Sequence, residues 1–550
     1  MSIGASAVWE CRTAGAELNG GGFALATAGT DFSQRDTKRT AGDVTNISAT
    51  DCSTTGSSTV NSASMNSTVA LVGNTISLSG GTRSACIDAT DIVANGTTTI
   101  TSATAIFNSN NVGALVKLSG GTGSLPAQWY RIATAPNPTT ITVDRAVATG
   151  TGITAFFAVW VQVSSVTNTT QIVVDRAHGL AGSGMTLNIG GALSNPIIAL
   201  NSAHSSNKVW LKDDGIYTSA VGMITPTGYG SPTNTLPPAF IRGYGTVRGD
   251  SGRATLQLTG ATSGLFMLKF ITASWQVENL IFDANNLAVS TCISMVSGDV
   301  TNCKFMNFTN AGIYQTGTSC MIYGNEFTGA TGSSAAIWTT GVGNVIDDNY
   351  IHDCALSGSA QAIYAAGAGN TVTRNIVANC SGATTDGIQF FVTSTQQAWV
   401  CRDNIVYNCG QNGISVLGTA IILSEVIGNI VSNNGAYGIK FGQATGQRAT
   451  LRWDGNVYYN NTSGTRFGGD DTTTTNKQNA AGAYTNVYDV ILSSSPFINA
   501  SGGDFSLNSN TAGLACRGSS QPRTWPGLTT TPRGFSDIGP IQHQEQGQAG

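Results

Sequence analysis

Five residues between positions 347 and 403 carry side chains that can transfer protons: Asp347, Asp348, His352, Asp386 and Asp403. Two carboxyl groups about 5 to 10 Å apart can hydrolyse a glycosidic bond, one as the acid and the other as base or nucleophile. Elimination from a sugar chain instead needs a basic residue, and acids that bind calcium can assist it. These five residues are therefore the candidate catalytic groups of a glycan-cleaving enzyme.

The positions of these residues also favour a structural role. Asp348, Arg374 and Asp403 each come directly before a recurring asparagine. If the repeats stack, Arg374 lies between the two acids, as in a ladder of salt bridges. His352 is typical of an exposed histidine, and Asp386 is a lone acid before a strand. We favour the structural interpretation and keep the catalytic one as the alternative.

A row of aromatic residues, Tyr314, Trp338 and Tyr364, forms a second candidate surface. Each follows an isoleucine that comes after a glycine or an alanine. Side chains alternate along a strand, so an inward isoleucine places the next side chain outward. Outward rings on adjacent repeats can stack on sugar rings, pack against a neighbouring subunit or lie under a loop of the same chain.

The elements that must position these residues are short strands in a periodic chain. Isoleucine follows a small residue at positions 293, 313, 337, 363, 388, 414 and 439, and a second marker occurs at Leu280, Cys303, Asn325, Asn349, Asn375, Asn404, Asn429 and Asn456. The shortest step of this second marker runs from 303 to 325 and the longest from 375 to 404. Such strands, separated by Gly and Asn turns, predict an all-β fold, a parallel β-helix with coils of about 22–29 residues.

Cysteine usage agrees with a stacked interior. Cys354, Cys380 and Cys409 each follow their marker asparagine by the same short interval, so we expect a ladder of buried, reduced side chains. The total of 11 cysteines is odd, which argues against a complete disulfide framework. The spacing of Cys and His residues matches no zinc site, so we expect no metal centre.

Composition excludes several kinds of partner. The net charge is −4 and only 10% of residues are charged, without a basic cluster, which argues against nucleic acid. The most apolar run, residues 153–161, is too short to span a membrane. The first residues, 1–4, have neither the basic nor the apolar region of a signal peptide, so we expect no export by the ordinary secretory route.

Three regions are expected along the chain. Residues 1–200 form a β-rich module, residues 201–540 form the β-helix, which opens near Ser205, and residues 541–550 form a tail. Within the first region, the segment 141–146 recurs in closely similar form at 172–177. This repeat predicts two related hairpin modules.

The openings and closings of the repeat region carry a family resemblance. Segments 209–217, 240–245, 495–498, 503–507 and 536–539, with the Asn and Gly-Ile turns between them, resemble right-handed parallel β-helix proteins of the pectate-lyase-like superfamily over residues 205–540. The opening segments 8–13 and 19–23 resemble the starts of β-helix proteins encoded in bacteriophage genomes.

This resemblance implies a bacteriophage virion protein, a β-helical tailspike, fibre or capsid decoration made in the host cytoplasm. Residues 1–200 would attach it to other virion proteins, the chain could form a homotrimer, and the helix would bind host-surface polysaccharide. The alternative is a polysaccharide lyase or glycoside hydrolase of the same fold, because one fold hosts many functions. Neither function requires a cofactor, although a lyase could use calcium.

Overall fold

The computed structural model describes residues 7–38, 48–203, 206–220, 223–225, 239–260, 266–270, 275–288, 291–392, 399–418, 424–442, 451–468 and 489–517. The chain falls into two units, residues 1–260 with 266–281, and residues 261–265 with 282–550. Both units consist mainly of β-strands, with α1 (Pro196–Ser202) in the first and α2 (Thr511–Cys516) in the second. The expected boundary at residue 200 stays a prediction, and the expected tail, residues 541–550, lies outside the described residues.

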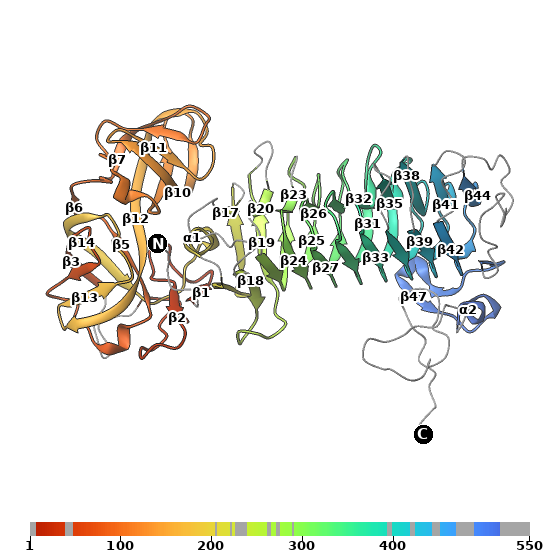
Figure 1. The fold of residues 1–550 in the computed structure, drawn as a ribbon, viewed down its shortest axis with the longest axis horizontal. Helices are drawn as coiled ribbons and strands as arrows, with labels where there is room; N and C mark the ends of the chain where they lie inside the picture. The colour runs from red at the N-terminus through yellow and green to blue at the C-terminus, as the bar shows by residue number, and fades with distance from the viewer. Residues whose placement is uncertain are drawn as a thin grey trace, which may run out of the picture. The chain divides into compact units, whose positions relative to one another are not determined.

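The second unit is a parallel β-helix in which each coil contributes one strand to each of three sheets (Figure 1). Sheet 1 contains β24 (Gly298–Thr301), β27 (Met321–Tyr323), β30 (Val345–Asp347), β33 (Thr371–Thr373), β36 (Val400–Arg402), β39 (Ser424–Ile427) and β42 (Leu451–Asp454). Sheet 2 contains β25 (Lys304–Met306), β28 (Glu326–Thr328), β31 (Tyr350–Ala355), β34 (Ile376–Ser381), β37 (Ile405–Tyr407), β40 (Ile430–Ser432), β43 (Val457–Tyr459) and β45 (Val490–Ile491). Sheet 3 contains β23 (Thr291–Met295), β26 (Ile313–Gln315), β29 (Ile337–Thr339), β32 (Gln361–Ala366), β35 (Asp386–Val392), β38 (Ile414–Gly418), β41 (Tyr437–Gly442) and β44 (Gly464–Gly468).

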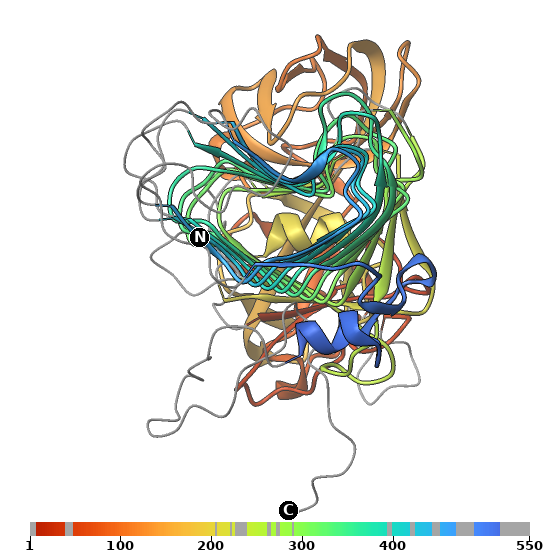
Figure 2. The same ribbon diagram turned by 90° about the vertical axis from the view of Figure 1, so that its right-hand side faces the viewer.

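The recurring isoleucines form the core of this helix, as the sequence predicted. Ile293, Ile313, Ile337, Ile363, Ile388, Ile414 and Ile439 are paired in register on sheet 3 and are fully buried. Burial of each such side chain stabilises the fold by about 1.5 to 3 kcal/mol. Seen along the stacking direction, the coils drawn from green to blue superimpose (Figure 2).

The marker asparagines form a buried hydrogen-bonded ladder between sheets 1 and 2. Each side-chain amide donates to the side-chain oxygen of the asparagine one coil on, at 2.9 to 3.0 Å, from Asn325 through Asn349, Asn375, Asn404 and Asn429 to Asn456. Each oxygen also accepts from the backbone N–H of the preceding asparagine, for example Asn349 N to Asn375 Oδ1 at 3.0 Å. The ladder therefore satisfies polar groups that would otherwise be buried without partners.

The residue before each ladder asparagine turns the corner from sheet 1 to sheet 2. Asp348, Arg374 and Asp403 have φ angles of 56°, 55° and 57°, and Gly324 and Gly428 occupy the same corner at 64° and 66°. The left-handed conformation suits Gly, Asn and Asp but is unfavourable for arginine. The common position of Asp348, Arg374 and Asp403 before an asparagine, which predicts a salt-bridge ladder, instead reflects three equivalent turns.

The cysteine ladder is confirmed. Cys354, Cys380 and Cys409 are buried and reduced, and Cys354 pairs in register with Cys380. Beyond them the same column continues with asparagine, because Cys409 N donates to Asn434 Oδ1 at 3.0 Å. Small side chains fill this corner on successive coils.

The predicted closing of the helix differs in part from the structure. The segments 495–498 and 503–507 do not form further coils: β46 (Phe497–Asn499) and β47 (Asp504–Leu507) make an antiparallel hairpin. Phe497 and Phe505 pack with Ile405 and Ile430 of sheet 2. The hairpin therefore covers an apolar column there. The remaining predicted segment, 536–539, lies outside the described residues.

In the first unit, a parallel sheet begins earlier than the sequence suggested. Residue 205 lies outside the described residues, but β1 (Ala7–Cys11) already pairs in parallel with β15 (Lys208–Lys212). The sheet continues through β18 (Ala239–Tyr244) to β21 (Trp275–Glu278). The unit also contains β2 (Gly22–Ala24), β16 (Ile216–Ser219), β17 (Met223–Thr225), β19 (Ala254–Leu258) and β20 (Phe266–Phe270). Strand β22 (Leu280–Asp283) begins at the end of this unit.

The segments 141–146 and 172–177 lie in two similar arrangements of strands, here called the inner and the outer copy, and the inner copy is inserted into the outer one. The outer copy consists of β3 (Ser48–Thr55), β4 (Thr59–Asn61), η1 (Val69–Leu71), β5 (Thr75–Ser79), the second half of β12 (Gly150–Asn168), β13 (Gln171–Val174) and β14 (Ala181–Ile189). The inner copy consists of β7 (Ala89–Ala94), β8 (Thr99–Thr101), η2 (Ser109–Asn111), β9 (Leu115–Gly120), β10 (Leu125–Asn137), β11 (Thr140–Val143) and the first half of β12. The short β6 (Thr82–Arg83) pairs with β14. Figure 1 shows the long β12 running through both copies.

Equivalent side chains make equivalent bonds in the first halves of the two copies. Asp51 of the outer copy accepts hydrogen bonds from Ser62 and Ser64. Asp91 of the inner copy accepts them from Ser102 and Thr104. The two aspartates therefore hold the same turn in each copy.

The second halves repeat a different pair of bonds. Arg145 bonds to Asp144 and to the carbonyl of Trp129, and Arg176 bonds to Asp175 and to that of Trp160. These are the residues of the segments 141–146 and 172–177 that recur in the sequence. The strands of both copies share one hydrophobic core.

Candidate functional site

The aromatic residues singled out in the sequence lie side by side on sheet 3. Tyr314, Trp338 and Tyr364 are paired in register on β26, β29 and β32. Their ring centroids are 5.6 and 5.5 Å apart, and the rings meet edge to face. All three side chains are half-buried. We call these residues, together with Phe391, the aromatic column.

Phe391 was missed in the sequence. Its ring stacks on that of Tyr364 with centroids 6.3 Å apart, and 37% of its surface is exposed. It lies on β35 in register with Ala366, at the next outward position beyond the one equivalent to Tyr364. The same alternation that places Tyr364 outward also applies to Phe391, and counting one further outward position per strand would have found it.

Among the candidate acids, Asp386 is buried and hydrogen-bonded, as is typical of a residue with a structural role. Asp386 is only 4% exposed. Its carboxylate accepts from Ser415 Oγ at 2.6 Å, from Gln389 Nε2 at 3.1 Å, and from the backbone and side-chain nitrogens of Asn412 at 3.0 and 2.7 Å. A buried carboxylate with so many donors ties adjacent coils together. This environment fits the structural interpretation better than catalysis.

Asp347 and Asp348 lie together at the corner between sheets 1 and 2. Arg374, one coil on, donates to Asp347 from Nε at 3.0 Å and also from Nη2, and Thr373 Oγ1 donates to it at 2.8 Å. The expected ladder, with Arg374 between Asp348 and Asp403, is therefore corrected: the ion pair is Asp347–Arg374. Side chains that leave a left-handed corner do not follow strand alternation, which is why the register alone misassigned the partner.

Asp348 is the corner residue with a perturbed acidity. Its pKa is raised by partial burial and by the neighbouring Asp347 carboxylate, while the charge of Arg374 and a hydrogen bond from Tyr323 act in the opposite direction. A protonated carboxyl group beside an ion-paired carboxylate can act as a proton donor. Asp403 occupies the same corner one coil beyond Arg374, and its neighbour Arg402 pairs with Glu425.

His352 belongs to a separate group on sheet 2. Its Nδ1 lies 2.8 Å from Asp353 Oδ2, its Nε2 lies 3.3 Å from Glu326 Oε1, and its ring stacks on Tyr350 with centroids 4.1 Å apart. Lys304 Nζ pairs with Glu326 at 2.8 Å. The side chain of His352 is only 16% exposed, so the simple expectation of an exposed histidine is modified: it is held between two carboxylates.

The candidate groups do not form one site. The aromatic column is on sheet 3, the Asp347–Asp348 corner joins sheets 1 and 2, and His352 is on sheet 2. Among the described residues, no group of three or more His, Cys, Asp or Glu side chains is placed to hold a metal ion. Nor does any helix in the described part of the chain have the length and apolar character to cross a membrane.

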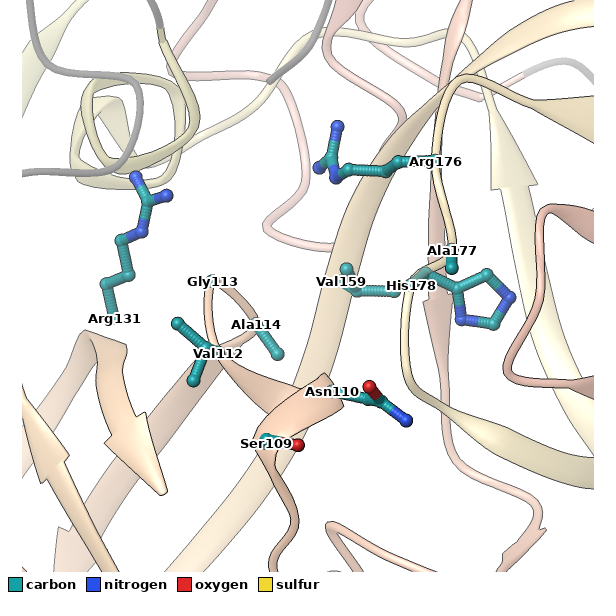
Figure 3. A pocket seen from close by; sticks show the side chains of 10 residues that line it. All are labelled: Ser109, Asn110, Val112, Gly113, Ala114, Arg131, Val159, Arg176, Ala177 and His178. Carbon is teal, nitrogen blue, oxygen red and sulfur yellow. The ribbon is translucent and has the colours of Figure 1, made fainter. Parts of the chain in front are cut away.

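A cavity of about 190 Å³ lies in the first unit, between the two nested copies. Ser109 and Asn110 of η2 line it from the inner copy, together with Arg131, while Arg176 and His178 come from the outer copy (Figure 3). Arg131 Nη1 donates to Asn201 O at 2.8 Å and Arg176 Nη1 to Asp175 at 2.7 Å. The first of these bonds ties the inner copy to α1 and the second lies within the outer copy, so both arginines of the cavity already have partners in this chain.

Comparison with solved structures gives matches of low identity and low TM-score. Pectate lyase Pel9A is 12% identical over 65% of this chain and 92% of its own, with a TM-score of 0.39. The polysaccharide lyase of family PL6 from Pseudopedobacter saltans is 14% identical over 62% and 96%, with a TM-score of 0.32. The Dettilon tailspike protein is 14% identical over 52% and 62%, with a TM-score of 0.32.

Among curated proteins, no sequence matches this chain significantly. Residues 290–463 match the family model described as the right handed beta helix region. These residues include the coils that carry the aromatic column and both groups of candidate acids. The match and the three parallel sheets together identify the repeat region as a right-handed parallel β-helix.

Proposed function

We propose that this protein binds polysaccharide through the aromatic column on sheet 3, and that it is a β-helical appendage of a bacteriophage virion. The column is the observation that carries the binding proposal. Four aromatic side chains from adjacent coils lie in contact, and Phe391 is 37% exposed. Aromatic rings stack on the apolar faces of sugars, and rings already held by packing lose little conformational entropy on binding.

The virion proposal rests on the resemblance of segments 8–13 and 19–23 to phage-encoded β-helix proteins. In this proposal residues 1–200 attach the protein to other virion proteins, and the helix faces the host surface. Mass spectrometry of purified particles provides the test: the chain should be found there in stoichiometric amounts. Its absence from particles of a phage that expresses it would refute the virion role and leave glycan binding untouched.

Substitution of Trp338 tests the column directly. We expect Trp338→Ala to weaken glycan binding tenfold to a hundredfold, because loss of a central ring costs about 1.4 to 3 kcal/mol. The matched control is Tyr459→Ala, which removes a half-buried aromatic side chain from sheet 2. The control should retain binding within about twofold, and both variants should keep the circular dichroism spectrum of the parent.

The same variants distinguish glycan binding from subunit contact. If the column instead packs against a neighbouring copy, as in a homotrimer, sedimentation of Trp338→Ala will show dissociation while glycan affinity is unchanged. That result would contradict the glycan proposal. Loss of glycan affinity with an unchanged sedimentation coefficient supports it.

A polysaccharide-cleaving enzyme is the second candidate, and the raised pKa of Asp348 beside Asp347 favours it. Removal of a general acid should lower cleavage roughly 100-fold or more. Release of reducing ends or unsaturated sugars should therefore fall by that factor in Asp348→Asn if the corner is catalytic. We expect no such loss, because the corner and the aromatic column lie on different sheets.

A further inference from the structure

The part of sheet 3 that carries the aromatic column is surrounded by uncharged residues. Charged side chains are absent from the sequence over residues 327–346, 354–373 and 387–401, which contain Trp338, Tyr364 and Phe391. The stretch 305–325 around Tyr314 is likewise uncharged. Exposed residues in the loops on either side of these strands include Thr316, Ser333, Thr340, Ser357 and Gly358.

The charged side chains of the same coils lie elsewhere. Lys304 pairs with Glu326 on sheet 2, and the ring nitrogens of His352 lie within hydrogen-bond distance of Glu326 and Asp353 beside it. Asp347, Arg374, Arg402 and Glu425 form ion pairs on sheet 1 and its corner. Most of the charged side chains of these coils therefore lie on or beside sheets 1 and 2, and three of the acids there are paired with a lysine or an arginine.

The charged residues on sheet 3 of the second unit do not alter this distribution. Asp386 is buried, and its carboxylate is occupied by hydrogen bonds from three side chains and one backbone amide. Lys440 occupies the outward position two coils beyond Gln389, past Ser415. Arg466 lies on β44, one coil further still. On sheet 3 of this unit, the positive charges therefore lie on coils beyond the rings.

Among the described residues of the strands that carry the rings, an anionic glycan would meet no arginine or lysine side chain. Carboxylate, sulfate and phosphate groups are recognised by arginine, lysine or clustered backbone amides, and a charge held against an apolar surface without a partner is unfavourable. An uncharged glycan meets no such penalty, because its hydroxyl groups can bond to Ser and Thr or remain in water while its apolar face covers the rings.

From this distribution of charge, and resting on the proposed function, we infer that the aromatic column takes an uncharged polysaccharide, one without uronate, sulfate or phosphate groups. Binding should depend little on salt. A surface that recognises anionic groups by arginine or lysine would instead lose affinity as salt screens it.

The experiment uses the full chain and two classes of probe. Dextran, a linear β-glucan, a mannan and a galactan are the neutral polymers, and polygalacturonate is the anionic one. The carboxymethylated derivative of the neutral polymer that binds serves as its charged match. We expect at least tenfold weaker binding of the carboxymethylated form, and a change of less than twofold in affinity for the neutral form between 50 and 500 mM NaCl.

A pair of charge variants at one position sharpens the test. Thr340 is exposed and follows Trp338 closely in the chain, after Thr339. Thr340→Lys should strengthen binding of the carboxymethylated polymer at least threefold, and Thr340→Glu should weaken it by a similar factor. Both should bind the neutral polymer within about twofold of the parent, which shows that the rings remain in place.

The outcomes separate the two proposals. Tight, salt-dependent binding of an anionic polymer that is lost in Trp338→Ala would overturn the inference of an uncharged ligand but keep the column as the binding site. Binding of neither class, or binding unaffected by Trp338→Ala, would refute the proposed function itself.

Discussion

At the scale of single residues, strand alternation predicted most positions correctly. Ile363 points inward and Tyr364 outward, because both lie in a regular strand whose neighbours on adjacent coils obey the same alternation. The prediction failed at the corner. Arg374 has a φ of 55°, and its long side chain reaches back to Asp347 on the preceding coil. The strand register predicts which backbone positions lie side by side. The partner of a long side chain such as that of Arg374 depends in addition on the direction in which the side chain points and on its length.

His178 gives a residue-scale prediction in the first unit. Its Nδ1 accepts from Leu180 N at 3.2 Å and its Nε2 lies 3.1 Å from Thr54 Oγ1, so the buried ring is neutral. Burial, and secondarily the charge of Arg176, lowers the pKa of His178 to about 4. The unfolded chain takes up this proton near pH 6.5, so the stabilisation is complete above that pH and is lost as the pH falls toward 4.

Below pH 6.5 this residue should therefore destabilise the first unit, by up to about 3 kcal/mol near pH 4. His178→Gln keeps polar groups at the site and removes the titration. Hydrogen exchange of peptides from residues 158–189, measured in both proteins at pH 7.5 and 4.5, should show a larger loss of protection in the parent. Equal losses would mean that His178 does not couple to folding.

At the scale of elements, the asparagine ladder explains why the coils keep register. Each ladder side chain satisfies groups on two coils, so a slip of one residue would leave several buried donors without acceptors. The recurrence of asparagine in the sequence predicted the position but not the function. A turn asparagine and a ladder asparagine have the same spacing, and only the depth of burial distinguishes them.

Asn375 and Asn379 test this distinction on one coil. Asn375 is fully buried and bonds to Asn349, Asn404 and Ile346. Asn375→Ala should cost about 3 kcal/mol or more, since several buried groups lose partners. The control Asn379→Gly removes a half-buried amide that donates to Asp353 and accepts from Asn408 at the surface. Its φ of 54° suits glycine, so the variant should cost only about 1 kcal/mol. Urea denaturation of both variants measures the difference. Similar costs would contradict the structural role of the ladder.

At the scale of the whole molecule, the second unit was far more predictable than the first. The β-helix repeats one coil, so its markers recur at a nearly constant step. Equivalent residues of the nested copies are not separated by one constant number of residues. The interval from Asp51 to Asp91 is longer than the interval from Arg145 to Arg176. An insertion breaks the period at the point where it enters, which is why the sequence revealed only the second halves.

The cysteines allow a prediction for the entire chain. All 11 are reduced and buried. Burial raises the pKa of the Cys52 and Cys86 thiols to about 12 and that of Cys320 to about 11, so few thiolates are present at pH 8 to react. Iodoacetamide should therefore add almost no mass to the native protein within minutes and should modify every cysteine after denaturation. Rapid modification of several cysteines in the native state would contradict the packing described here.

The nested copies also mark a place where the chain tolerates foreign sequence. The inner copy enters the outer one just after Gly80 and Gly81, and the equivalent residues of the inner copy, Gly120 and Gly121, form the turn from β9 to β10. Both glycine pairs have φ angles between 64° and 74°. Exposed turn tips are the positions at which insertions succeed most often. We therefore expect the turn after Gly121 to accept an inserted peptide for display, because the fold already accommodates a full module at the equivalent turn.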